Sequence, residues 1–137
     1  MHTALTGGYT SPGGVLLTGD AANIAQGDNL LSQIVPVIMA SDAYQNHGAI
    51  IIWWDESEGD GVGKEDDYNH TIGEIIISDR AHPNVNGLPY ASQVDYTHSS
   101  DLRTMQDIFR VGPYLGDAAN ANDLSDLFKP GVVPNKP

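Results

Sequence analysis

The 137-residue sequence contains no cysteine, which excludes disulfide bonds and zinc sites built on thiolates. Lysine and arginine are also scarce: six of them stand against eighteen aspartate and glutamate residues, for a formal net charge of -12. Nucleic acid and anionic membranes both attract positively charged surfaces, so this balance argues against either as a partner. No stretch approaches the roughly 20 apolar residues of a membrane-spanning helix, and we predict no membrane span.

The length of the chain predicts a single domain over residues 1–137, because domains typically contain roughly 100 to 200 residues. Residues 1–26 are rich in glycine and predict a loop-rich lead with at most one short strand. Residues 131–137 form a short tail with proline and glycine. The regular structure is therefore expected between these two segments.

One apolar run ends directly at paired carboxylates. The run from Ala49 to Trp54 is β-branched and aromatic, which predicts a strand buried on both faces inside a parallel sheet. Asp55 and Glu56 follow it at once. Ligands of open α/β sheets bind outside the carboxyl ends of the strands, so these two acids are candidate ligands of a hard divalent cation such as Mg, Ca or Mn. The alternative, a solvated acidic loop, remains open.

Helical and strand patterns alternate on either side of this run. Apolar residues spaced by three and four predict a helix from Asp28 to about Ala43 that packs on the sheet, with Pro36 inside it. A second short apolar strand is predicted from Gly73 to Ser78. The order of helix and strand predicts an α/β fold with a mostly parallel sheet flanked by helices.

The last third of the sequence predicts a long loop and two helices. Residues 79–97 carry proline and glycine but few apolar residues, and loops of this length are usually functional. Ser99 or Ser100 is expected to cap a helix that ends at Gly112 and Pro113. A final short helix is expected at about 121–128.

Two histidines are candidates for proton transfer or anion binding. His98 directly precedes the expected helix start, where exposed N–H groups and the helix dipole favour an anion such as phosphate. An ordinary hydrogen-bonded loop histidine is the open alternative for His98 on position alone. His70 stands just before the second strand and could reach the acidic loop as a ligand or proton donor, although an ordinary loop histidine is the favoured interpretation there. No serine or threonine has an identifiable base partner in the sequence, so no nucleophile is assigned.

Several ordered motifs resemble one known family. They are Gly27-Asp28-Asn29-Leu30-Leu31, the run that ends in Trp54-Asp55-Glu56, Ile75-Ile76-Ile77-Ser78, Tyr96-Thr97-His98-Ser99-Ser100-Asp101-Leu102-Arg103-Thr104, Gly116-Asp117-Ala118-Ala119-Asn120 and Asp123-Leu124-Ser125-Asp126-Leu127-Phe128. Together they resemble the C-terminal half of the phosphoesterase family, which holds acid phosphatases and phospholipases C of the alkaline phosphatase superfamily. The resemblance covers about residues 27–130.

The resemblance implies a partial alkaline-phosphatase-like fold and metal-dependent hydrolysis of a phosphate ester, as in an acid phosphatase. It implies that Asp55 and Glu56 bind the active-site metal, which could be Mg, Ca, Mn or Zn, and that His98 lies at the phosphate or the metal. The family usually has Asp-His-Val where this sequence has Asn69-His70-Thr71, so the resemblance leaves His70 without a clear role. A secreted or periplasmic location is also suggested by the resemblance.

The N-terminal half of such enzymes, with its Glu-Asn metal ligands and its Ser or Thr nucleophile, has no counterpart in this sequence. We therefore expect this chain to be the C-terminal part of a larger phosphoesterase domain and to be incomplete as an enzyme. A phospholipase C-type phosphodiesterase and a catalytically silent truncated module are the alternatives. Self-association through an exposed sheet edge is also expected, because half of a sheet leaves unpaired backbone groups.

Overall fold

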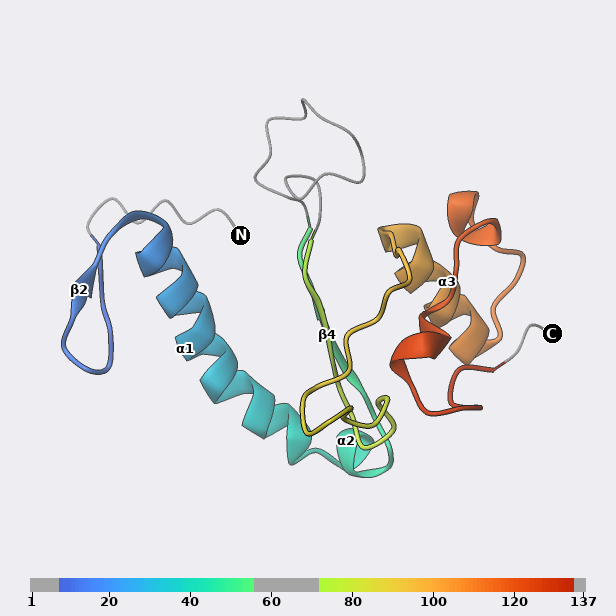
Figure 1. The fold of residues 1–137 in the computed structure, drawn as a ribbon, viewed down its shortest axis with the longest axis horizontal. Helices are drawn as coiled ribbons and strands as arrows, with labels where there is room; N and C mark the ends of the chain where they lie inside the picture. Colours follow the sequence, from blue (N-terminus) through green and yellow to red (C-terminus); the bar gives the residue numbers. More distant parts are fainter. Residues whose placement is uncertain (1–7, 56–71, 135–137) are drawn as a thin grey trace. The chain divides into compact units, whose positions relative to one another are not determined.

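A computed structural model describes residues 8–55 and 72–134 of the protein. The chain divides into two compact units, Met1–Asn46 and His47–Pro137. The described residues show an α/β protein with two short antiparallel sheets and three α-helices (Figure 1). None of these helices is both long enough and apolar enough to cross a membrane.

The first unit combines a small hairpin with one long helix. Strands β1 (Tyr9–Thr10) and β2 (Leu16–Leu17) pair antiparallel and contact α1 (Gly19–Met39), which a short helix α2 (Asp42–Gln45) follows. Ser41 caps α2, since its hydroxyl accepts a hydrogen bond from the Tyr44 N–H.

The predicted start of the long helix was wrong by nine residues. The helix begins at Gly19 and not at Asp28, and it ends at Met39, before the expected Ala43. The added turns contain Ala21, Ala22 and Ala25, which favour helix strongly but carry no apolar period, so the pattern could not reveal them. The helix continues through Pro36, as the period predicted.

The second unit contains the two apolar strands, and they pair antiparallel. Strand β3 (Ile50–Trp53) lies against β4 (Glu74–Ile77), with Ile50 opposite Ile77 and Trp53 opposite Glu74. Both strands were predicted within two residues, but the parallel arrangement expected of them is not what this pair adopts. A continuous apolar run indicates burial and not direction, so the pattern could not distinguish an antiparallel pair from a parallel one.

One face of this sheet carries the core of the second unit. Leu124, Phe128 and Val133 form a buried cluster, and Ile51 and Ile76, which share a face of the sheet, pack against it. The other face holds Trp54 and Ile75, which are 49% and 47% exposed. The prediction of a strand buried on both faces is therefore wrong for the described residues, because no residue of β3 is fully buried.

Helix α3 (His98–Phe109) follows the irregular segment 78–97, and two 3-10 helices, η2 (Gly116–Ala119) and η3 (Leu124–Leu127), come after it. The single final helix expected at 121–128 is thus replaced by shorter turns. Helix α3 buries a polar face, made of Ser100, Asp101, Arg103, Thr104, Gln106 and Asp107. Its apolar residues Leu102, Ile108 and Phe109 are exposed.

Candidate functional site

His98 lies at the carboxyl end of β3. Its Nε2 is 2.9 Å from the carbonyl oxygen of Trp54, the residue directly before Asp55. A carbonyl oxygen only accepts hydrogen bonds, so Nε2 carries the ring proton and donates it, which leaves Nδ1 of the neutral ring as an acceptor. Two residues that the sequence assigned to one site, Asp55 and His98, therefore belong to neighbouring segments.

The first turn of α3 is fixed by a reciprocal cap. Thr97 has an extended backbone and directly precedes the helix, and its N–H donates to the hydroxyl of Ser100 at 3.1 Å. The Ser100 N–H donates to the carbonyl of Thr97 at 2.8 Å. His98 is thus the first residue of the helix, where the expected cap at Ser99 or Ser100 had placed it just outside. The cap holds the His98 backbone in place.

The other predicted site residues are only partly described. Asp55 is exposed at the end of β3. Glu56 and His70 lie outside the described residues. Over residues 8–55 and 72–134, no group of three or more histidine, aspartate and glutamate side chains is arranged to hold a metal ion. The metal ligation implied for Asp55 and Glu56 accordingly stays a prediction.

A carboxyl pair that sequence analysis missed lies beside this site. Glu74 is the first residue of β4 and stands opposite Trp53, and Asp101 is in the first turn of α3, one turn beyond His98. The two side chains share a hydrogen bond. Burial, followed by the charge of Asp101 and this hydrogen bond, raises the pKa of Glu74 to about 7. Burial also raises the pKa of Asp101, against the lowering effects of the hydrogen bond and of His98.

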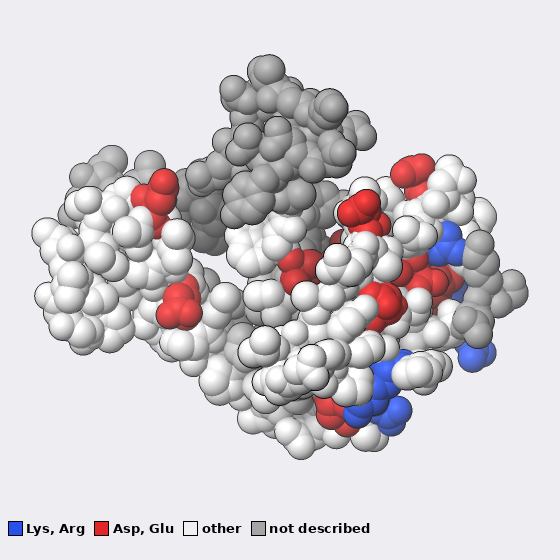
Figure 2. All heavy atoms as spheres, viewed as in Figure 1, with Lys and Arg blue, Asp and Glu red and all other residues white. Residues whose placement is uncertain are grey.

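The raised pKa values of both carboxyls favour one proton on the pair near neutral pH, and we expect it on Glu74, whose pKa is raised to about 7. The only sequence signal for this pair was an acid inside an apolar strand, in Gly73-Glu74-Ile75-Ile76-Ile77. Its partner is 27 positions further along the chain, and no local pattern connects the two. Figure 2 shows the wider setting, in which red acidic side chains outnumber blue basic ones on the visible face of the second unit.

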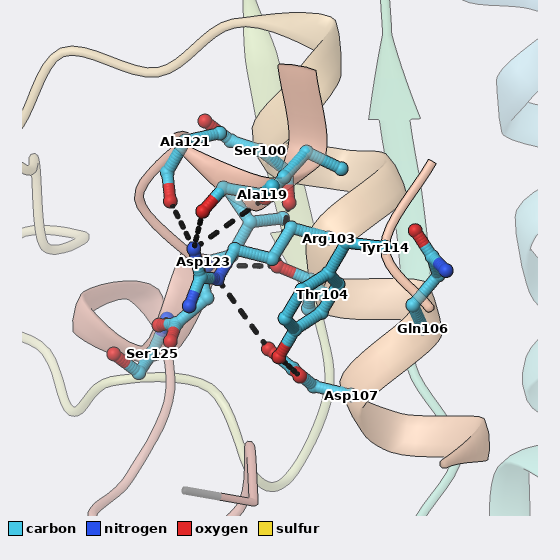
Figure 3. Close-up of polar contacts among 12 residues, drawn as sticks. Ser100, Arg103, Thr104, Gln106, Asp107, Tyr114, Ala119, Ala121, Asp123 and Ser125 are labelled. Atoms are coloured by element: carbon cyan, nitrogen blue, oxygen red, sulfur yellow. Dashed lines mark hydrogen bonds and ion pairs between the residues drawn. The ribbon is translucent and has the colours of Figure 1, made fainter. Parts of the chain in front are cut away.

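The polar face of α3 is held by the chain that follows it (Figure 3). Nη1 of Arg103 donates to the carbonyls of Ala118, Ala119 and Ala121 at 3.4, 3.3 and 2.7 Å. Its Nε lies 3.7 Å from Oδ2 of Asp107, whose other oxygen accepts a hydrogen bond from the Tyr114 hydroxyl. Arg103 belongs to the family-like motif but acts here as a structural residue that fixes α3.

A second hydrogen-bonded bridge joins α3 to η3. The hydroxyl of Thr104 donates to the Ser100 carbonyl at 2.8 Å and accepts from the Leu124 N–H at 2.9 Å. Both residues that flank this hydroxyl in space are fully buried or nearly so, at 2% exposure for Ser100 and 0% for Leu124. These two hydrogen bonds fix α3 against η3, so His98 is held at the start of a helix that is anchored on its buried face.

A cavity among the described residues runs along β4 and not at Asp55. It has a volume of about 690 Å³, extends from Glu74 to Lys129, and is lined by Tyr90 and by His82, whose rings stack at 3.8 Å. Neither Asp55 nor His98 lines it. We place the candidate site at the end of β3 and not in this cavity, because Asp55, which can bind a cation, and His98, which can transfer a proton, lie there.

No protein-family model matches the chain, and neither a curated protein nor a solved structure matches it. The motifs and the site geometry therefore carry the functional argument alone.

Proposed function

We propose that the chain is the C-terminal portion of a metal-dependent phosphoesterase that hydrolyses phosphomonoesters. The observation that supports this best is the hydrogen bond from His98 to the Trp54 carbonyl, because it brings together two of the motifs that resemble the phosphoesterase family. For the fold we propose a partial alkaline-phosphatase-like domain, in which parallel strands from the rest of the domain would extend the β3–β4 sheet.

In this proposal Asp55 and Glu56 hold the divalent metal ion, whose carboxylate set suits Mg, Ca or Mn, with Zn as a further possibility. The metal would polarise a phosphoryl oxygen when bound. His98 keeps Nε2 on the Trp54 carbonyl and uses Nδ1 toward a phosphoryl oxygen or the leaving group, as an acid in its protonated form. The N–H groups at the start of α3 add partial positive charge for the phosphate.

The nucleophile is assigned to a part of the protein outside the motifs that resemble the phosphoesterase family. Exposed apolar surfaces of the second unit support a larger domain. Leu102 and Phe109 on α3 and Ile75 on β4 are 39%, 70% and 47% exposed. In a complete enzyme these surfaces would contact the rest of the domain. In this chain alone they favour self-association, together with the outer edges of the β3–β4 sheet, which have no further strand among the described residues.

The test is binding of inorganic phosphate in the presence of Mg²⁺, followed through the imidazole nitrogens of His98 by ¹⁵N NMR. Phosphate should shift Nδ1 of His98 in a saturable way, and Asp55→Asn should remove the shift. Asp79→Asn is the matched control, because Asp79 is an exposed acid that pairs with His47 and is remote from the proposed chemistry. A His98 spectrum that phosphate leaves unchanged would refute the proposal.

Activity assays then separate the alternatives. Hydrolysis of a chromogenic phosphomonoester above background, lost in both Asp55→Ala and His98→Ala, would show that the chain is active alone. Preference for phosphatidylcholine in a parallel assay would assign the phospholipase C activity. Phosphate binding without turnover of either substrate is the result we expect from half of an active site, whereas neither binding nor turnover would leave the silent module as the better explanation.

A further inference from the structure

The pair Glu74 and Asp101 leaves two buried carboxyl oxygens without a partner. Asp101 is 7% exposed, and its Oδ1 and the Oε1 of Glu74 have no hydrogen-bond donor within the described part of the chain. A buried acceptor left without a donor costs about 1 to 3 kcal/mol, and a charged one costs more. A proton or a cation is therefore expected at these oxygens.

The described side chains do not provide that positive charge. Arg103 is close in sequence, but its Nη1 is committed to three carbonyls and its Nε lies near Asp107. His98 lowers the pKa of Asp101 through its charge, yet its Nε2 is bound to the Trp54 carbonyl. A proton or a cation from solution remains as the neutralising partner.

The two carboxyls are presented by elements that are fixed independently. Glu74 is held by its place in the β3–β4 ladder, and Asp101 by the capped first turn of α3, which Thr104 and Arg103 anchor from behind. Carboxylates that approach from two rigid elements can hold a hard cation without ordering a loop, and water can fill the other coordination positions.

We propose that Glu74 and Asp101 form a site for a hard divalent cation such as Ca²⁺ or Mn²⁺, distinct from the ligands Asp55 and Glu56 of the proposed phosphoesterase site. The cation replaces the proton that the two carboxyls share in its absence, and that proton is released to solvent. The site couples β4 to the start of α3, and thereby steadies the helix that carries His98.

Terbium luminescence provides a direct test, because Tb³⁺ occupies Ca²⁺ sites and emits when a nearby tryptophan is excited. The bond from the Trp54 N–H to the Gly73 carbonyl makes Trp53 and Glu74 a non-hydrogen-bonded pair, the kind whose side chains lie closest. Trp53 is thus placed beside the proposed ion. We expect saturable Tb³⁺ emission that Ca²⁺ and Mn²⁺ reverse by competition.

Variants assign the emission to this pair. Glu74→Gln and Asp101→Asn should each raise the Tb³⁺ concentration at half-saturation at least tenfold. Asp55→Asn and Asp79→Asn should leave the same component in place, so this site and the proposed phosphoesterase site can fail separately. Glu74→Gln keeps the size and can still donate to Asp101, so it decides the matter if Asp101→Asn does not fold.

Two results would overturn the proposal. One is the absence of saturable emission from the wild-type protein. The other is emission that Glu74→Gln leaves unchanged, which would place the ion on other acids and leave a shared proton as the only occupant of the pair.

Discussion

The imidazole Nε2 of His98 and the carbonyl oxygen of Trp54 lie 2.9 Å apart, so the first residue of α3 is joined directly to the end of β3. The bond also fixes the chemistry of the ring, since the nitrogen that faces the carbonyl must carry a proton. The remaining nitrogen, Nδ1, is the one that can accept a hydrogen bond from a ligand. The hydrogen bond thus predicts the Nε2–H tautomer for the neutral ring of His98.

We expect the neutral ring of His98 to be protonated on Nε2. The ¹⁵N shifts of the imidazole distinguish the two tautomers directly. His98→Ala should lower the free energy of unfolding by about 1 kcal/mol through loss of one hydrogen bond, and His98→Gln should lose less because its amide can still donate. Urea unfolding measures both, and a dominant Nδ1–H tautomer would contradict the interpretation.

The carboxyl pair predicts an unusual dependence of stability on pH. The pKa of Glu74 rises from 4.5 to about 7 in the folded protein, so the folded state holds a proton that the unfolded state has released between these values. Its contribution to stability is complete below pH 4.5 and is lost as the pH rises through 7. Because Glu74 is partly screened by solvent, we expect a loss of about 1 kcal/mol.

Urea unfolding with a chelator present, at a series of pH values, measures this loss. Glu74→Gln should remove the decrease between pH 5 and 8, because glutamine does not titrate. The same decrease in wild type and variant would show that another group is responsible. The pH dependence at Asp79 has the opposite sign. A hydrogen bond to His47 lowers the pKa of Asp79, so its contribution to the stability of the fold is lost as the pH falls.

Arg103 should be among the most sensitive positions of the second unit. It is 5% exposed and joins α3 to the carbonyls of residues 118, 119 and 121. Arg103→Met leaves these carbonyls and Asp107 without their cation, and we expect a loss of about 3 kcal/mol in urea unfolding. Arg80→Met is the control, because Arg80 is exposed, and should change stability by less than about 0.5 kcal/mol.

Two glycines should respond to alanine with opposite signs. A Cβ at Gly73 would lie 2.5 Å from the indole of Trp54, so Gly73→Ala must displace that ring and should change the tryptophan fluorescence as it lowers stability. Gly27 lies inside α1 with nothing within 4 Å of its would-be Cβ. Gly27→Ala should stabilise by about 0.8 to 1 kcal/mol. Equal effects at both sites would contradict the close packing at Gly73.

The exposed face of the β3–β4 sheet should promote association. We expect sedimentation velocity to show a sedimentation coefficient that increases with protein concentration. Ile75→Lys places a charge on the exposed face of β4 and should shift the distribution toward monomer. Lys substitution at Val15, which is 58% exposed in the first unit, serves as the control. A compact monomer at all concentrations would rule out this association.

The apolar strands could be predicted from the sequence, but their direction could not. Runs of isoleucine after Gly48 and Gly73 are typical of strands, and both strands appear within two residues of the expected bounds. The side chains of a strand are the same whichever way its neighbour runs. Only the connection between β3 and β4 decides the direction, and that connection carries no apolar pattern.

Local patterns also could not reveal the partners of single polar residues. His98 was recognisable because it stands at a helix start, and Asp55 because it ends an apolar run. Glu74 and Asp101 are candidates only because they interact with each other, and they lie 27 positions apart on two different elements. The polar face of α3 is a similar case, since Arg103 and Thr104 each have a partner in the chain beyond residue 117.

The buried polar face of α3 sets an order of events during synthesis. A helix that buries apolar residues can pack against any apolar surface of the chain synthesised so far. Helix α3 instead needs particular hydrogen-bond acceptors and donors from residues 111–124. Those residues leave the ribosome after the helix itself. His98 can therefore take its lasting position beside Trp54 only once the end of the chain has been made, so a premature stop before Leu124 would lose the site even though every residue of the site had been translated.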